Sequence, residues 1–514
     1  MRSNNMKFSF IICVCWSTLL LTASDIPTSF EFPTLINEHL CNDDISLNFS
    51  NAIITSIGQN FISSPLISCL SITNTGIQSI EKGAFDELPN LTQLLISNNN
   101  INLDQLFSFG SHKNLKILIL NSCNNNDLST IDILEEYPNL EFLSLRTNHI
   151  KDLRTLKEET PFPKLQKLDL SNNIIEGTNF VELLPNSLYF LDLHDNSLNS
   201  LAFDKKQVNL STLNLDNNNL KYVKKYNDSS VPHNLQRQYN QQQYDPYNQH
   251  YQYDQYNPHN QYNQYNQYDQ YNRHNGRLDF YGRENDNPQN FGLAMFGLEN
   301  LHYLSISQNK IDFIESNAFE NTSKLIYLNL SKNNISYLHA ETFEKLQSLR
   351  LLDLSFNKLE DVPQISSETI ISILSLNCNN IKSLSSNAFV QMPKLTKLLL
   401  GGNEIAEINV KAFARTSLLE MLDLSKNKLS FLPEEWSESF TTFKYLNLND
   451  NQFTSLESLS LTNALPLIEV HLAMNPLEYL DVSYFKNLPQ NLTVNLMQES
   501  HFAKHWNSNA CESN

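Results

Sequence analysis

The chain has 514 residues, 40% of them hydrophobic, and a formal charge of -19 from 36 basic and 55 acidic residues. Such an acidic chain is a poor partner for a nucleic-acid backbone, so we expect no nucleic acid among its ligands. The length would ordinarily divide into about three or four domains. Internal repeats overrule that expectation, because a solenoid grows along one axis without a single central core.

Residues 1–23 are predicted to be a secretory signal peptide. Arg2 and Lys7 precede an apolar run that ends at Leu21, and small residues follow up to Ala23. The run is too short to cross a bilayer as a helix, and no later stretch is apolar for long enough. The sequence therefore predicts a secreted, soluble, extracellular protein with no direct membrane insertion.

Residues 24–66 are predicted to form an N-terminal cap ahead of the repeats. Cys41 lies in this cap and Cys69 lies in the first repeat. An oxidising extracellular compartment would allow a disulfide between them, and we predict this pair.

The stretch Leu325–Ser348 reads LIYLNLSKNNISYLHAETFEKLQS and fits the repeat pattern L-x-x-L-x-L-x-x-N-x-L. Alternate residues of a strand face opposite sides, so Leu328 and Leu330 should point into the solenoid and Asn329 out of its concave face. Asn333 lies where the chain turns away. Its amide can bond backbone groups that would cost about 1–3 kcal/mol each if they were buried without a partner.

Fifteen such repeats form two arrays, 67–225 and 293–491, with spacings of 22 to 25 residues wherever the array is unbroken. An Ala-Phe pair precedes several repeats and should belong to the core. This regularity predicts an α/β leucine-rich-repeat solenoid, or horseshoe, with a concave parallel β-sheet. The repeats begin at Ile67, Leu91, Leu115, Leu140, Leu165, Leu188, Leu210, Leu301, Leu325, Leu349, Ile371, Leu395, Leu419, Phe443 and Leu467.

Three further cysteines belong to the predicted mature chain. Cys123 takes the place of the turn asparagine, where a buried thiol is an alternative, so we expect an inert packed thiol. Cys378 stands one place before the turn asparagine of its repeat, at the edge of the concave side. Cys511 has no obvious partner, which leaves an intermolecular disulfide, and hence a covalent oligomer, or a free thiol.

Residues 226–292 interrupt the array. The distance from Leu210 to Leu301 exceeds one repeat by 67 residues, and the segments on either side complete one repeat between them. The centre of this Tyr/Asn/Gln-rich, low-complexity insertion, Gln236–Arg277, has ten tyrosines and no aliphatic residue. With so little to bury, it should be a disordered loop on one solenoid, although such tracts can also self-associate.

The pattern resembles the typical animal extracellular leucine-rich-repeat family, which includes Toll-type receptor ectodomains and secreted insect repeat proteins. The resemblance implies binding of a protein or another ligand on a curved parallel sheet. Arrays of this family commonly close with a cysteine-rich flank, but Tyr479 and Asp481 stand where its cysteines are expected. In the flank at 492–514, a strand at Leu492–Leu496 would have to cover the last repeat by packing.

The sequence shows no pattern that indicates an enzyme, a cofactor or a metal site. It has only 11 glycines, and neither a phosphate-binding loop nor a Gly-x-Ser-x-Gly elbow. His501 and His505 have the spacing of a zinc-protease helix without its glutamate. Four aspartates recur at one strand position as part of the repeat pattern: Asp169, Asp192, Asp353 and Asp423.

The outward strand positions are the ones free to carry function. Exposed aromatic residues on a concave sheet are typical of a protein-binding face. The alternative is that they pack sideways on neighbouring strands and are hidden. The candidate concave binding face consists of Phe142, Phe190, Tyr303, Tyr327 and Tyr445.

Eight N-glycosylation sequons add a constraint, because a glycan shields the surface around it. Asn329 differs from the others in being an outward residue of a strand on the concave side. The sequons are Asn48, Asn90, Asn209, Asn227, Asn321, Asn329, Asn334 and Asn491.

Two functional hypotheses remain open. The first is a secreted binding protein in innate immunity or extracellular signalling that recognises a protein or microbial ligand, with a soluble decoy of a Toll-type receptor as a variant. The second is an extracellular matrix or structural protein that assembles through its tyrosine-rich loop.

Overall fold

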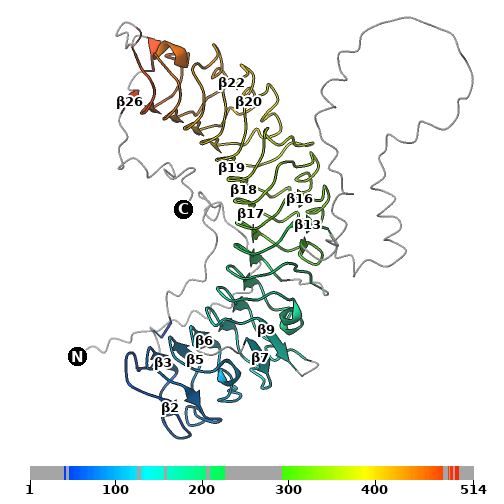
Figure 1. Ribbon diagram of the computed structural model, residues 1–514, viewed down its shortest axis with the longest axis vertical. Coiled ribbons are helices and arrows are strands. Elements are labelled where there is room, and N and C mark those ends of the chain that lie inside the picture. The colour runs from blue at the N-terminus through cyan, green and yellow to red at the C-terminus, as the bar shows by residue number, and fades with distance from the viewer. Residues whose placement is uncertain are drawn as a thin grey trace, which may run out of the picture.

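The computed structural model describes residues 40–41, 45–123, 129–155, 159–203, 209–225, 292–478, 484, 487–489 and 492–496. The predicted signal peptide, nearly all of the predicted insertion and the chain beyond 496 lie outside these residues. Within them, the chain winds into a curved solenoid with one short strand per turn along its concave side (Figure 1). The predicted leucine-rich-repeat solenoid is confirmed.

One sheet of 17 parallel strands lines the concave side, and each strand pairs with those of the turns before and after it. Fifteen strands belong to the fifteen predicted repeats, and one further strand lies at each end. In spatial order they are β1 (Ser46–Asn48), β3 (Cys69–Thr73), β5 (Gln93–Ser97), β6 (Ile117–Asn121), β8 (Phe142–Ser144), β10 (Lys167–Asp169), β11 (Phe190–Asp192), β12 (Thr212–Asn214), β15 (Tyr303–Ser305), β17 (Tyr327–Asn329), β18 (Leu351–Asp353), β19 (Ile373–Ser375), β21 (Lys397–Leu399), β23 (Met421–Asp423), β24 (Tyr445–Asn447), β25 (Glu469–His471) and β26 (Thr493–Asn495).

The core is continuous along the solenoid because every turn contributes the same inward positions. Leu328 lies in β17 and Leu330 directly follows this strand; they are 1% and 0% exposed. The equivalent leucines of neighbouring turns join them in one hydrophobic cluster that runs from the first turn to the last. At roughly 1.5–3 kcal/mol for each fully buried side chain, this stack is the main stabilising term of the fold.

The convex side consists of turns, short strand pairs and 3₁₀ helices; no α-helix occurs among the described residues. The phenylalanines of the Ala-Phe pairs are buried here, and the rings of Phe389 and Phe413 stack with centroids 5.8 Å apart. The short elements are β2 (Ser56–Ile57) with β4 (Ser79–Ile80), β7 (Thr130–Ile133) with β9 (Asp152–Thr155), β20 (Ser383–Leu384) with β22 (Glu407–Ile408), and the 3₁₀ helices η2 (Leu103–Gln105), η3 (Asn179–Leu183) and η8 (Glu457–Leu459).

A ladder of asparagine side chains holds the turns that follow most of the strands. The Asn333 Nδ2 donates to the carbonyls of Ile306 and Leu330 at 2.9 and 3.1 Å, and its Oδ1 accepts the Ile311 N–H at 3.0 Å. Cys123 replaces asparagine in one turn, where its Sγ lies 3.2 Å from the Ile96 carbonyl. The ladder thus pairs backbone groups that would otherwise be buried without partners.

The insertion leaves and re-enters the solenoid at one place. β13 (Tyr222–Lys224) precedes it and β14 (Gly292–Ala294) follows it, and the two strands pair in parallel. β14 lies between Leu201 of the preceding turn and β13, while β13 also pairs with β16 (Phe313–Ile314) of the next turn. Gly292, which we assigned to the insertion, is therefore part of the solenoid.

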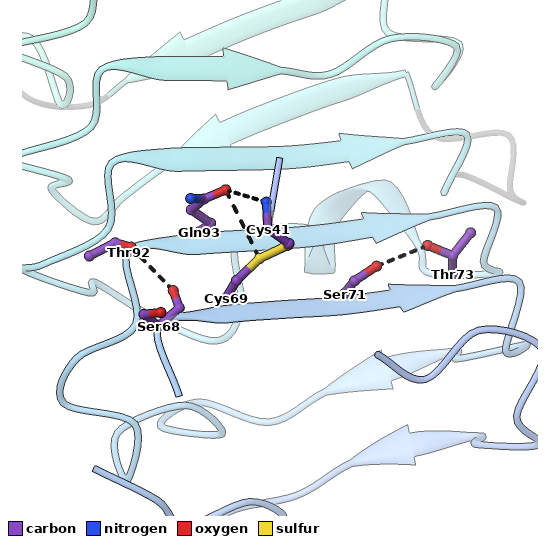
Figure 2. Close-up of a disulfide and its surroundings, with 7 residues drawn as sticks. All are labelled: Cys41, Ser68, Cys69, Ser71, Thr73, Thr92 and Gln93. Atoms are coloured by element: carbon purple, nitrogen blue, oxygen red, sulfur yellow. Dashed lines mark hydrogen bonds between the residues drawn. A yellow bond between two sulfur atoms is a disulfide. The ribbon is translucent and has the colours of Figure 1, made fainter. Parts of the chain in front are cut away.

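Each end of the sheet carries a strand beyond the repeats. At the N-terminal end a disulfide joins Cys41 to Cys69 of β3, and the Cys41 N–H donates to the Gln93 Oε1 at 3.2 Å (Figure 2). Because Cys69 faces out of the concave side, this bond fastens a preceding segment onto that face. At the other end, β26 covers β25 within the stretch where we predicted a closing strand.

A candidate binding surface on the concave sheet

Two rows of outward side chains run across the concave sheet. The parallel register aligns the first outward residue of every strand with those of its neighbours, and likewise the second. We call these the first and second concave rows. The first row is Ser46, Cys69, Gln93, Ile117, Phe142, Lys167, Phe190, Thr212, Tyr303, Tyr327, Leu351, Ile373, Lys397, Met421, Tyr445, Glu469 and Thr493. The second row is Asn48, Ser71, Leu95, Ile119, Ser144, Asp169, Asp192, Asn214, Ser305, Asn329, Asp353, Ser375, Leu399, Asp423, Asn447, His471 and Asn495.

All five aromatic residues of the predicted binding face lie in the first concave row, but they differ in exposure. Phe142, Tyr303 and Tyr445 are half-buried. Phe190 and Tyr327 are only 5% and 1% exposed. The sideways packing that we considered as the alternative therefore describes these last two residues.

Tyr327 belongs to an apolar cluster that spans four neighbouring strands. It packs with Leu351 and Ile373, and Tyr303 lies against them with its ring centroid 6.3 Å from that of Tyr327. We call these four residues the concave apolar cluster. The aromatic pattern alone missed its two aliphatic members, although their positions in the repeat would have identified them.

The recurring aspartates of the second concave row bind the turns that follow them. The Asp353 Oδ1 accepts the Ser355 N–H at 2.9 Å and the Ser355 hydroxyl at 2.6 Å, and the Asp423 Oδ1 accepts the Ser425 N–H at 2.9 Å. Burial raises the pKa of Asp353 and of Asp423 above the ordinary value. The hydrogen bonds show a structural role for these carboxylates, in agreement with their origin in the repeat pattern.

Two further polar residues were not singled out by the sequence. Asp216 accepts the Ser305 hydroxyl and the Ser307 N–H, both at 2.6 Å, and so connects the turns on either side of the insertion. His194 lies with its Nδ1 2.7 Å from the Asp192 Oδ1. Burial lowers the pKa of His194, but the hydrogen bond and charge of Asp192 outweigh it, so that the pKa is raised.

The sequons differ in accessibility. Asn48, Asn90, Asn209, Asn321 and Asn334 are exposed, whereas Asn329 is half-buried and its Oδ1 accepts the Ser331 N–H at 3.0 Å. Asn227 and Asn491 lie outside the described residues.

The described cysteines are in three different states. Cys41 and Cys69 form the disulfide described above, and Cys123 is a buried free thiol whose pKa burial raises to about 12. Cys378 is half-buried and disulfide-bonded, and its partner lies outside the described residues. Cys511 lies outside them as well.

The part of the chain that the structure describes contains no group of three or more His, Cys, Asp or Glu residues placed to hold a metal ion. His501 and His505 are not in that part. A search of the same residues for a helix long and apolar enough to cross a membrane found none.

Comparison with known proteins supports the assignment of the repeats. The family model described as "Leucine rich repeat" matches residues 299–359, 369–405 and 393–453. Mimecan of Coturnix japonica is 30% identical over 157 residues, which are 30% of this chain and 50% of that protein. Toll-like receptor 9 of Mus musculus is 32% identical over 122 residues, 24% of this chain and 12% of the receptor. The chain thus spans about half the length of the Mimecan sequences that it matches. It spans a much smaller share of the Toll-like receptor.

Among solved structures, the Toll–Spatzle complex, titled a molecular hub in Drosophila development and innate immunity, is similar over 84% of this chain and 54% of the matched chain. The TM-score is 0.54 and the sequence identity 17%. At this identity the similarity concerns the fold alone. From the repeats, the parallel sheet and the relatives together, the chain is a leucine-rich-repeat protein related to the extracellular leucine-rich-repeat proteins of animals.

Proposed function

We propose that this protein is a secreted, non-enzymatic binding protein that recognises a protein or microbial ligand in innate immunity or extracellular signalling. One observation supports this proposal above the others. The outward rows of the concave sheet carry a varied set of aromatic, aliphatic and charged side chains, whereas the inward rows repeat the same leucines. Varied side chains on a constant scaffold are what selective recognition requires.

Binding by full-length protein tests the proposal. Immobilised protein should recover a saturable partner from the native secretion, and the combined variant Phe142→Ala, Tyr303→Ala and Tyr445→Ala should bind it at least ~10-fold more weakly, because interface aromatics carry much of the binding energy. Tyr337→Ala is the matched control, since Tyr337 is 58% exposed and lies outside both concave rows. Equal loss in both variants, or none in either, would exclude the concave face.

The acidic character of the chain also predicts that single-stranded RNA does not bind. The formal charge of -19 opposes the approach of a phosphate backbone. Titration with labelled RNA at low salt is the direct measurement, and saturable binding there would contradict this expectation.

A structural role in the extracellular matrix is the second candidate. The observation that favours it is the adjacency of β13 and β14, which would present the tyrosine-rich insertion from a single point of the solenoid. Deleting residues 226–291 should then abolish assembly and leave a folded monomer. Sedimentation of the same species with and without these residues would exclude this role, and with it the self-associating loop.

A further inference from the structure

The N-terminal end of the concave sheet has an open edge. β1 pairs with β3 on one side, where the Phe49 N–H next to β1 donates to the Ser71 carbonyl at 2.8 Å. Backbone groups of successive residues in a strand point to opposite sides, so those of Ser46 and Asn48 point away from β3. Among the described residues, no strand pairs with β1 on that side. Such an edge offers hydrogen bonds to another extended chain.

The N-terminal disulfide leaves this edge open. It bonds Cys41 to Cys69 of β3, and the Cys41 N–H donates to the Gln93 side chain of β5 (Figure 2). β3 and β5 are the second and third strands from this end of the sheet. The bond therefore holds Cys41 over the sheet rather than beside β1.

The inward side chains of the first turn are covered on one side only. Leu47 and Phe49 take the positions that Leu328 and Leu330 hold in the turn of β17. They are half-buried and pack against the core, whereas Leu328 and Leu330 are 1% and 0% exposed. The difference arises because an inner turn has a neighbour on both sides.

Further apolar side chains of the same turn are exposed. We call the outer side of residues 45–66 the N-terminal end face. Its most exposed apolar residue is Ile53, at 96%, and the Phe61 ring lies 6.1 Å from that of Phe49 between centroids. The exposed large apolar residues of this face are Ile45, Ile53, Phe61 and Leu66.

The N-terminal end face is also uncharged, although 18% of the residues in the chain are charged. Residues 45–66 contain no Asp, Glu, Lys, Arg or His. The carboxylates that contact this turn, Glu81 and Glu87, belong to the next one. A net charge of -19 makes two copies of the chain repel each other, and an uncharged face is where that repulsion is weakest.

We propose that two copies of this chain associate through their N-terminal end faces, with β1 of each copy pairing antiparallel across a twofold axis. The pairing would join the two concave sheets into one and bury the apolar residues of both end faces. A second copy fits this face better than a partner recognised by charge, because the face has no charge to recognise. A twofold contact also closes, so it yields a dimer and not a fibre.

The other end of the solenoid is a poorer match for this face. It carries Glu469 in β25 and the exposed Glu478, and β26 already covers the last repeat. Contact between the two different ends would place these carboxylates against an apolar surface, which costs free energy. Contact between two N-terminal ends avoids that cost.

The sequon at Asn48 is compatible with the arrangement. The Asn48 side chain belongs to the second concave row, and side chains stand roughly perpendicular to a sheet. A glycan at Asn48 would rise from the concave face and leave the edge of β1 free. The dimer likewise requires no ligand on the concave sheet, so it is independent of the proposed function.

Sedimentation of the full-length protein over a range of concentrations tests the proposal. The wild type should show a reversible equilibrium between monomer and dimer. The double variant Ile53→Glu and Leu66→Glu should raise the dissociation constant at least ~10-fold, because it buries unpaired charges in the interface. Phe431→Glu is the matched control, since Phe431 is an exposed apolar residue of another turn, and it should leave the equilibrium unchanged.

Three outcomes would overturn the proposal: a wild type that stays monomeric at its highest soluble concentration, a dimer that persists in the double variant, and equal weakening by Phe431→Glu. Ile53 and Leu66 are 96% and 65% exposed, so their substitution should not disturb the fold. Circular dichroism spectra that match the wild type would verify this.

A second pair of variants tests the pairing of β1 itself. Ser46→Pro removes an N–H from the open edge, and proline is tolerated at the first residue of a strand. It should weaken the dimer at least ~10-fold relative to Ser46→Ala, which keeps the N–H. Equal dissociation constants for the two variants would show that the copies do not meet through the edge of β1.

Discussion

Tyr327 and Asn329 occupy the two outward positions of one three-residue strand, but their surroundings differ. Tyr327 packs into the concave apolar cluster and is 1% exposed, whereas Asn329 is half-buried. The Asn329 Oδ1 accepts the Ser331 N–H at 3.0 Å. This hydrogen bond fixes the orientation of the amide whose nitrogen a glycan would occupy.

We therefore predict that Asn329 carries no glycan while Asn334, which is exposed, does. Asn329 is only half-buried, but it lies beside the buried Tyr327, and Ser331 of the same sequon is only 8% exposed. Glycopeptide mapping of the secreted protein decides this. An occupied Asn329 would mean that the concave face near β17 is open, contrary to the burial of Tyr327.

Asp353 allows a prediction about pH. Burial raises the pKa of Asp353, so the folded protein holds a proton there more tightly than the unfolded chain does. The stability linked to this group is complete below the unfolded-state pKa and is lost as the pH rises through the folded-state pKa. Asp353→Asn should therefore stabilise the protein at pH 7 and have little effect at the acidic end of the folding range.

The chain itself indicates that the substitution keeps the local hydrogen bond. Asn447 takes the same strand position in another repeat, and its Oδ1 accepts the Asn449 N–H at 3.2 Å, much as the Asp353 Oδ1 accepts that of Ser355. Urea unfolding at both pH values provides the measurement. Destabilisation of Asp353→Asn at neutral pH would show that the carboxylate charge is needed where it lies.

At the scale of elements, Gly292 decides how the chain returns from the insertion. A Cβ at this position would lie 2.6 Å from the carbonyl oxygen of Tyr222 on the paired strand β13, closer than side chains approach backbone atoms. A close approach of two strands, rather than an unusual backbone angle, therefore demands glycine here. We assigned Gly292 to the insertion because composition does not reveal which strand β14 pairs with.

Gly292→Ala should lower the free energy of unfolding by about 1–3 kcal/mol, the usual effect of forcing an extra methyl group into a packed site. Gly177→Ala is the control, because a Cβ added at Gly177 would have no other atom within 4 Å and the backbone there has no positive φ. Chemical denaturation of both variants measures the difference. If the two alanines have the same effect, the close pairing of β14 with β13 does not limit stability.

At the scale of the whole molecule, the sequence predicted what repeats and could not predict what varies. Every turn places the residue equivalent to Leu328 in the same buried environment. Periodicity therefore predicts the inward rows, the ladder of asparagines and the fifteen strands. The exposure of Tyr327 depends on Leu351 and Ile373, which lie in the next turns and are 24 or more residues away in the sequence. Such contacts between turns, and the pairing of β14 with β13 across the insertion, exist only in three dimensions.

The same pairing predicts how the solenoid responds to loss of the insertion. Lys225 follows β13 directly and Gly292 begins β14, so a short Gly-Ser linker can replace residues 226–291 without disturbing the turns that Asp216 joins to Ser305. A loop roughly ten times shorter loses less entropy on closure, by about 2 kcal/mol. The shortened protein should therefore keep its far-ultraviolet circular dichroism spectrum per solenoid residue and unfold at a higher urea concentration. Lower stability after the replacement would mean that the removed residues contribute contacts to the fold.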